Sequence, residues 1–167
     1  MMKIKLSDVN NASDRKYKFV FDVSASEFDF STQDYRIDGI IKVSGTAEDM
    51  GMDYHVYGDI KCHRQFICDR CLEKTAEFQN HTFDEIYKKD QSEEIEDVNL
   101  VSDDFIDITD LVRDAIITGQ PISNVCRPDC KGLCPKCGTN LNESNCSCDR
   151  TVTDVRLMVL KKLLKNS

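Results

Sequence analysis

Residues 126–148 read CRPDCKGLCPKCGTNLNESNCSC and hold six of the nine cysteines of this 167-residue chain. The spaces between these cysteines are rich in Gly and Asn, so the stretch cannot build a hydrophobic core of its own. The cysteines must therefore supply its structure. The other three, Cys62, Cys68 and Cys71, lie far upstream.

The spacing within the stretch predicts a four-thiolate metal site. Cys134 and Cys137 are separated by two residues and followed by Gly138, so both thiolates can turn toward one metal ion. Cys146 and Cys148 follow after a turn-forming segment and would complete a tetrahedron. These four cysteines are predicted to hold a structural Zn2+.

Two further pairs allow a second site of the same kind. Cys126 and Cys130 are left over, because one tetrahedral ion cannot use six ligands, and Cys68 and Cys71 form an upstream CxxC pair. One or two structural Zn2+ ions are therefore expected, with Cys62 unpaired. The eight candidate ligands are Cys68, Cys71, Cys126, Cys130, Cys134, Cys137, Cys146 and Cys148.

Two other uses of the cysteines are weighed against zinc. A disulfide framework is disfavoured by the odd cysteine count and by a start, Met1–Leu6, that alternates polar and apolar residues instead of forming a signal-peptide core. A thiol redox centre at Cys68 and Cys71 stays open, although residues 72–76 give only a short helical hint after the pair. The same start predicts a cytoplasmic location, where reduced thiols favour metal binding over disulfides.

Charge is distributed unevenly along the chain, whose net charge is −8. Residues 126–167 carry eight Lys and Arg against four acidic residues, whereas residues 84–110 carry eleven acidic residues and two lysines. The acidic stretch is typical of an exposed loop or linker, with docking of a basic protein partner as the alternative. No apolar run approaches the ~20 residues of a membrane helix, so no membrane association is expected.

Period-two alternation predicts an antiparallel sheet. It occurs around residues 17–23, 37–43 and 54–68, with bulges expected at Gly39 and Gly45 and a bend at Gly58. Residues 49–51 are predicted to form a hairpin turn, and a return strand near Phe78 would put the CxxC pair at a hairpin tip. The parity of the long strand places Cys62 on the buried face and His55 and His63 on the polar face.

Two amphipathic helices are expected. Apolar residues recur at helical spacing from Ile108 to Ile116, after a start capped by Asp107 or Thr109. The last helix should run over residues 153–165. Its basic side chains are candidate contacts for RNA or a partner, although the Arg156 stem could instead pack on the core with its head at the solvent. These candidates are Arg156, Lys161, Lys162 and Lys165.

The predicted fold class is α+β: an antiparallel, barrel-like sheet domain with packed helices and a cysteine-rich zinc-knuckle segment at the C-terminal end. The antiparallel domain with its CxxC hairpin is expected over residues 1–89, and an acidic linker over 90–106. The amphipathic helix then occupies residues 107–125, and the zinc segment with the final helix 126–167.

The combination of motifs resembles the YceD-like proteins of bacteria and plastids. The motifs are CDRCLE at residues 68–73, DITDLVRDAI at 107–116, the cysteine run from 126 to 148, and Arg156 before a leucine-rich helix. They occur in this order over the C-terminal hundred residues. The resemblance implies a role in the accumulation of large-subunit ribosomal RNA, with an rRNA precursor or a ribosomal protein as partner.

No catalytic constellation is recognisable, since the sequence contains no phosphate-binding glycine loop and no His-Glu-x-x-His motif. The leading hypothesis is therefore a noncatalytic ribosome-assembly factor stabilised by zinc. The alternatives are a thiol redox protein using Cys68 and Cys71, and an acidic chaperone for a basic ribosomal protein docking on residues 84–110.

Overall fold

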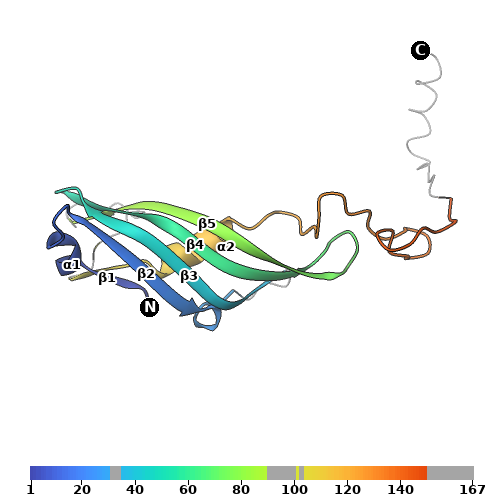
Figure 1. Ribbon diagram of the computed structural model, residues 1–167, viewed down its shortest axis with the longest axis horizontal. Helices are drawn as coiled ribbons and strands as arrows, with labels where there is room; N and C mark the ends of the chain where they lie inside the picture. The colour runs from blue at the N-terminus through green and yellow to red at the C-terminus, as the bar shows by residue number, and fades with distance from the viewer. Residues whose placement is uncertain (31–34, 90–100, 102–103, 150–167) are drawn as a thin grey trace, which may run out of the picture. The chain divides into compact units, whose positions relative to one another are not determined.

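A computed structural model describes residues 1–30, 35–89, 101 and 104–149 of the chain (Figure 1). The chain divides into two compact units: Met1–Phe66 with Lys74–Asn124, and Ile67–Glu73 with Val125–Ser167. The helix expected over residues 153–165, including Arg156, Lys161, Lys162 and Lys165, lies outside the described residues, as does most of the acidic linker. The finer division into four segments stays a prediction.

The first unit is built on a four-stranded antiparallel sheet of order β2-β3-β4-β5, in which consecutive strands are neighbours. The strands are β2 (Lys16–Ser24), β3 (Tyr35–Asp49), β4 (Asp53–Ile67) and β5 (Lys74–Lys88). The first three correspond to segments that the alternation predicts, and β5 is the return strand predicted near Phe78. Gly51, with φ +93°, donates its N–H to the Asp49 carboxylate at 2.9 Å in the predicted turn between β3 and β4.

One face of the sheet is buried and the other is exposed, as period-two strands require. Cys62 is 2% exposed on the buried face of β4, where its parity places it. His55 and His63 lie on the other face, as predicted, and bond the carboxylates of Asp84 and Asp38 at 2.7 and 2.5 Å. Both histidines therefore have protein partners on this face.

Short elements cover the buried face. They are β1 (Lys3–Lys5), paired with β6 (Phe105–Asp107), and the helices α1 (Leu6–Asn10), η1 (Ala25–Glu27, a 3-10 turn) and α2 (Thr109–Thr118). The α2 helix begins where the Asp107 carboxylate accepts the Thr109 N–H at 2.9 Å. The helix lies against the sheet (Figure 1), and its Val112 and Ile116 are buried in the core.

The α+β prediction is therefore only partly supported. The described residues form mostly sheet, with two short α-helices and one 3-10 turn. Within this part of the chain the four-stranded sheet is open, with β2 and β5 at its edges, so it is not barrel-like. The alternating polar and apolar residues at the start of the chain form a strand only as far as Lys5, because Leu6 starts α1.

The strand glycines have two different roles. Gly39, with φ +73°, lies at the register shift between Asp38 and Lys42, so the bulge predicted there is confirmed. Gly45 is paired regularly with Gly58, and the bulge predicted at Gly45 is wrong. The two glycines instead allow β3 and β4 to approach closely, since a Cβ on Gly58 would lie 2.2 Å from the Ser44 carbonyl oxygen and 2.8 Å from the Phe83 ring.

We expect Gly58→Ala to lower the free energy of unfolding by about 1–3 kcal/mol, because the added methyl group must displace backbone as well as the Phe83 ring. Urea unfolding followed by circular dichroism measures the change. Ser44→Ala, an exposed position in the adjacent strand, is the matched control and should shift stability by less than about 0.5 kcal/mol. Equal effects of both substitutions would contradict this account of Gly58.

Candidate metal centres

The structure brings the eight candidate cysteines together in two sets of four. The first set is Cys68, Cys71, Cys126 and Cys130; the second is Cys134, Cys137, Cys146 and Cys148. Within each set all four sulfur atoms lie within 4.8 Å of one another. This is the division that counting the cysteine pairs predicts.

Distances within the first set fit tetrahedral metal coordination. The sulfur atoms of Cys68 and Cys130 are 3.9 Å apart, and those of Cys71 and Cys126 are 3.7 Å apart. A Zn–S bond of about 2.3 Å gives sulfur–sulfur distances of about 3.8 Å in a tetrahedron. A disulfide would require about 2.0 Å, and all nine cysteines are free. The donor sets therefore suit a thiophilic ion such as Zn2+.

Backbone geometry at the hairpin tip positions the first set. The Leu72 N–H bonds the Cys68 carbonyl at 2.9 Å, and the Cys68 N–H bonds the Glu73 carbonyl at 2.9 Å. Leu72 takes φ +59°, which closes the turn. This confirms the prediction that the CxxC pair lies at the tip of the β4–β5 hairpin. The Cys126 N–H then donates to the Cys68 sulfur at 3.4 Å.

The second set is held by a tight knuckle. The Gly138 N–H bonds the Cys134 carbonyl at 2.9 Å, and the Cys134 N–H bonds the Thr139 carbonyl at 2.8 Å. Gly138 has φ +73°, a conformation that glycine adopts without strain, as its position after the CxxC pair predicts. The Thr139 hydroxyl lies 3.2 Å from the Cys137 sulfur.

Three polar contacts join the knuckle to the first set. The Leu133 N–H bonds the Arg70 carbonyl at 3.0 Å, and the Asn140 side-chain amide donates to the Glu73 carboxylate at 2.7 Å. The Asn142 side-chain amide lies 3.4 Å from the Cys130 sulfur. Such contacts orient ligands and offset thiolate charge. Sequence reasoning missed both asparagines, because turn residues give no sign of a distant partner.

The thiol pKa values diverge within each set. At Cys68 burial raises the pKa, but N–H groups of the backbone lower it by more, to about 6. Burial and the neighbouring sulfurs raise the pKa of Cys126 to about 12. In the second set the Thr139 hydroxyl lowers the pKa of Cys137 to about 6, while the hydrogen bond with Cys137 raises that of Cys148 to about 12. Four crowded thiolates cannot all ionise without a cation to offset their charge.

A family model matches most of the chain. Residues 56–164, which include both cysteine sets, match the family model described as "Large ribosomal RNA subunit accumulation protein YceD". The chain belongs to the YceD family.

Several curated proteins are similar to this YceD-family chain over part of their length. An uncharacterised protein of Mycobacterium tuberculosis is 37% identical over 79 residues, which are 44% of the chain and 38% of that protein. A chloroplastic protein of Arabidopsis thaliana, named large ribosomal RNA subunit accumulation protein YCED homolog 1, is 43% identical over 49 residues, 29% of the chain and 15% of that protein. Its Zea mays counterpart is 48% identical over 48 residues, 28% and 16%. No solved structure matches.

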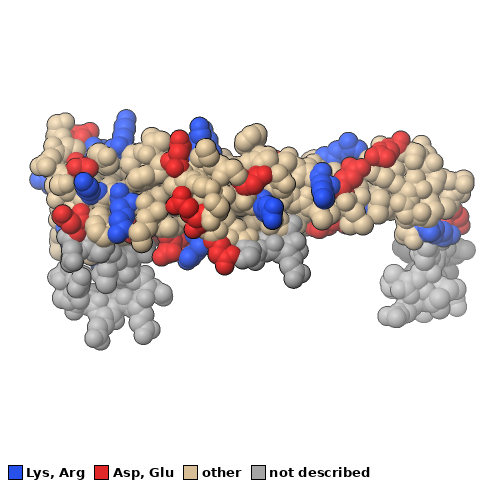
Figure 2. Space-filling view, turned by 90° about the horizontal axis from the view of Figure 1, so that it is seen from below, with Lys and Arg blue, Asp and Glu red and all other residues tan. Residues whose placement is uncertain are grey.

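The chain thus spans well under two thirds of the length of these relatives. In the described part of this YceD-family chain, helices are too short and too polar to cross a membrane. Figure 2 shows acidic and basic side chains interspersed over the face in view, without a patch of one sign.

Cys62 lies outside both sets, and burial raises its pKa to about 11. In the YceD-family chain stripped of metal without denaturant, we expect iodoacetamide at pH 7.5 to modify the eight set cysteines, because loss of the metal unfolds the second unit and exposes their thiols, and to leave Cys62 unmodified within the folded sheet. Mass spectrometry of peptides reports each site, and urea-unfolded chain serves as the control in which Cys62 is also labelled. Rapid native labelling of Cys62 would contradict its burial.

Sequence reasoning also missed the role of Arg64, which is 1% exposed. Its guanidinium donates to the Glu77 carboxylate at 3.0 Å and to the Asn124 side-chain oxygen, and lies 4.5 Å from the Phe66 ring centre. The parity of β4 puts Arg64 on the same face as Cys62, which is the signal that could have identified it. Its partners come from separate segments, so the sequence could not name them.

Proposed function

We propose that this YceD-family chain is a noncatalytic ribosome-assembly factor that supports the accumulation of large-subunit ribosomal RNA. The observation that carries the proposal is the family match across both cysteine sets. The names of the two plant relatives point to the same process. Its partner in this role is a precursor of the large-subunit rRNA or a ribosomal protein bound to it.

We further propose that each cysteine set binds one structural Zn2+. The all-thiolate donors, sulfur separations near 3.8 Å and N–H groups directed at the sulfurs support this assignment. Zinc would hold residues 67–73 against the segment from 125 onward, within the second unit. The basic residues Arg156, Lys161, Lys162 and Lys165 stay candidate RNA contacts.

A thiol redox role for Cys68 and Cys71 has weaker support. A redox pair needs one exposed thiolate and a resolving thiol, whereas these two cysteines are 0% and 4% exposed. Each also has a further cysteine sulfur within 4 Å, which suits a shared metal ion better than an exchange reaction.

Depletion of the protein in its own host tests the ribosomal role. Large-subunit rRNA should fall relative to small-subunit rRNA, and sucrose gradients should show fewer large subunits. Re-expression of the wild-type chain controls for secondary effects, and a variant with both sets mutated should fail to restore the ratio. Unchanged rRNA ratios and subunit profiles after depletion would refute the role.

A further inference from the structure

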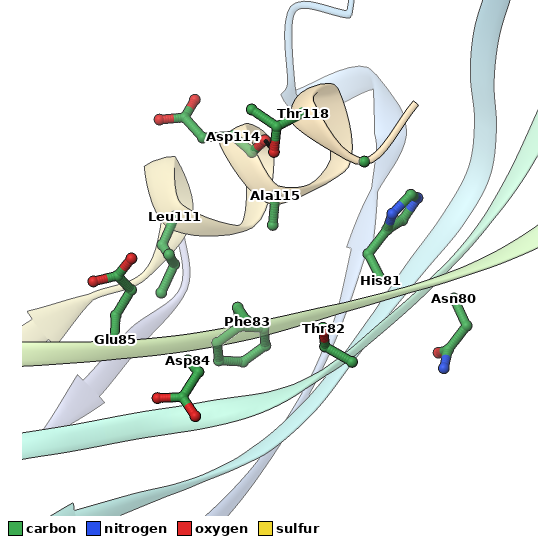
Figure 3. A pocket seen from close by; sticks show the side chains of 11 residues that line it. Asn80, His81, Thr82, Phe83, Asp84, Glu85, Leu111, Asp114, Ala115 and Thr118 are labelled. Carbon is green, nitrogen blue, oxygen red and sulfur yellow. Dashed lines mark hydrogen bonds between the residues drawn. The ribbon is translucent and has the colours of Figure 1, made fainter. Parts of the chain in front are cut away.

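A groove of about 540 Å3 lies between β5 and α2 in the first unit. One wall is six consecutive residues of β5, 80–85, and the other is the side of α2 that carries Leu111, Asp114, Ala115 and Thr118. Figure 3 shows His81 directed from β5 toward α2, and Leu111 and Ala115 directed from α2 toward β5. The lining is mixed, with Phe83, Leu111 and Ala115 as its apolar side chains and polar residues around them.

The strand that forms this wall is a sheet edge. Among the described residues β4 is the only strand paired with β5. Along an edge strand alternate residues direct their N–H and C=O groups away from the sheet, where they can bond another strand. Six residues of strand extend about 20 Å, which matches an extended peptide of similar length.

Both edges of the sheet carry charges that discourage pairing with another chain, namely Lys16 and Lys18 on β2 and Lys74, Glu77, Asp84, Glu85 and Lys88 on β5. On β5, residues 78–83 read FQNHTF and contain no Lys, Arg, Asp or Glu. Burial lowers the pKa of His81, so this side chain is also uncharged at neutral pH. An uncharged edge segment is suited to accept a strand.

Charge at the groove selects the kind of strand. The lining contains the carboxylates of Asp84, Glu85 and Asp114 and no Lys or Arg. The side chains of Asp84 and Asp114 are 75% and 61% exposed, and they bond His55 at 2.7 Å and Arg113 at 3.1 Å, so a basic ligand would have to compete with these partners. A basic segment would be attracted, and the acidic residues 90–100 of the chain itself would be repelled.

We propose that this groove binds an extended basic peptide segment of a partner protein, which joins the edge of β5 as a fifth strand. Main-chain hydrogen bonds to β5 provide affinity, and Asp84, Glu85 and Asp114 select Lys or Arg side chains. The proposal goes beyond the ribosomal role and rests on the groove alone. It can fail while the zinc and rRNA proposals hold.

The test uses the full metal-loaded chain and a fluorescein-labelled eight-residue peptide of alternating Val and Lys, followed by fluorescence anisotropy. We expect saturable binding that weakens with added salt. The same peptide is also N-methylated on alternate residues, in each of the two possible registers, so that the methylated positions cannot donate strand hydrogen bonds. In one of the two registers the methylated peptide should bind about tenfold more weakly or worse. A Val and Glu peptide should not bind. Absent binding of the Lys peptide, or equal affinity in both N-methylated registers, would overturn the proposal.

Charge reversal locates the site. The double variant Glu85→Lys and Asp114→Lys should weaken binding about tenfold or more, whereas Asp59→Lys, exposed on β4 outside the groove, should change it less than about twofold. Circular dichroism verifies that each variant is folded. Equal losses in both variants would show binding to general negative charge. Tighter peptide binding after Lys161, Lys162 and Lys165 are changed to Glu would identify the chain's own tail as the occupant, and would also overturn the proposal.

Discussion

Replacing Cys68 or Cys130 with serine is expected to reduce bound zinc from two ions per chain to one and to unfold the first cysteine set. The reason is that the described part of the second unit has little other core. Its hydrophobic cluster consists of Cys68, Cys71 and Cys130, with Val125 and Cys126 packed against them. Metal ligation therefore has to provide the stability that apolar side chains provide elsewhere.

The expected loss of folding free energy is large because the four cysteines of the first set close long loops of the chain. Cys68 and Cys130 are 62 positions apart, and Cys71 and Cys126 are 55 apart. Structural zinc binds zinc-finger peptides with apparent free energies of about 10–16 kcal/mol, most of which is available to folding. Losing one of four thiolates should cost several kcal/mol, enough to unfold a unit whose described residues bury so few apolar side chains. Metal analysis gives the stoichiometry, and hydrogen exchange of residues 125–149 reports the unfolding.

Cys62→Ser is the matched control for the zinc variants. Cys62 is equally buried, but it belongs to neither set. This variant should keep two zinc ions while burial of the hydroxyl group lowers the free energy of unfolding of the sheet by about 1–3 kcal/mol. If Cys68→Ser kept two zinc ions and normal exchange protection, the assignment of the first set would be wrong.

Arg64→Ala is expected to lower the free energy of unfolding of the first unit by about 3–5 kcal/mol. The guanidinium is buried between the rings of Tyr35 and Phe66, at 5.1 and 4.5 Å from their centres. Its loss leaves a cavity, breaks the ion pair with Glu77 and removes the donor to Asn124, the last residue of this unit. Arg64→Lys should recover only part of the loss, because an ammonium group cannot bond both partners in a plane.

Urea unfolding of the first unit measures these changes, and Lys61→Ala is the control. Lys61 is exposed on the same strand, so its removal should change stability by about 0.5 kcal/mol or less. The loss of stability in Glu77→Gln should lie between the losses in Arg64→Ala and Lys61→Ala, because the side-chain amide still accepts a hydrogen bond from Arg64. Arg64→Ala with wild-type stability would mean that the buried charge contributes nothing net, as happens when desolvation cancels pairing.

Much of the fold could be predicted because its signals are local. Alternation along residues 54–68 placed Cys62 inside and His55 and His63 outside, and helical spacing from Ile108 to Ile116 located α2. Both patterns follow from backbone periods of 2.0 and 3.6 residues. Gly45 was misread because a glycine that permits close strand packing looks the same in sequence as one at a bulge.

The sequence predicted the strand periodicity and allowed a division of eight cysteines into two sets, because pair spacing and tetrahedral coordination leave few combinations. Which distant groups meet depended on the tertiary structure. It brought Asn142 to Cys130, surrounded Arg64 with Glu77 and Asn124, and set α2 beside the open edge of β5 to form the groove. Those contacts depend on how the chain folds back on itself over tens of residues, and no local pattern encodes that.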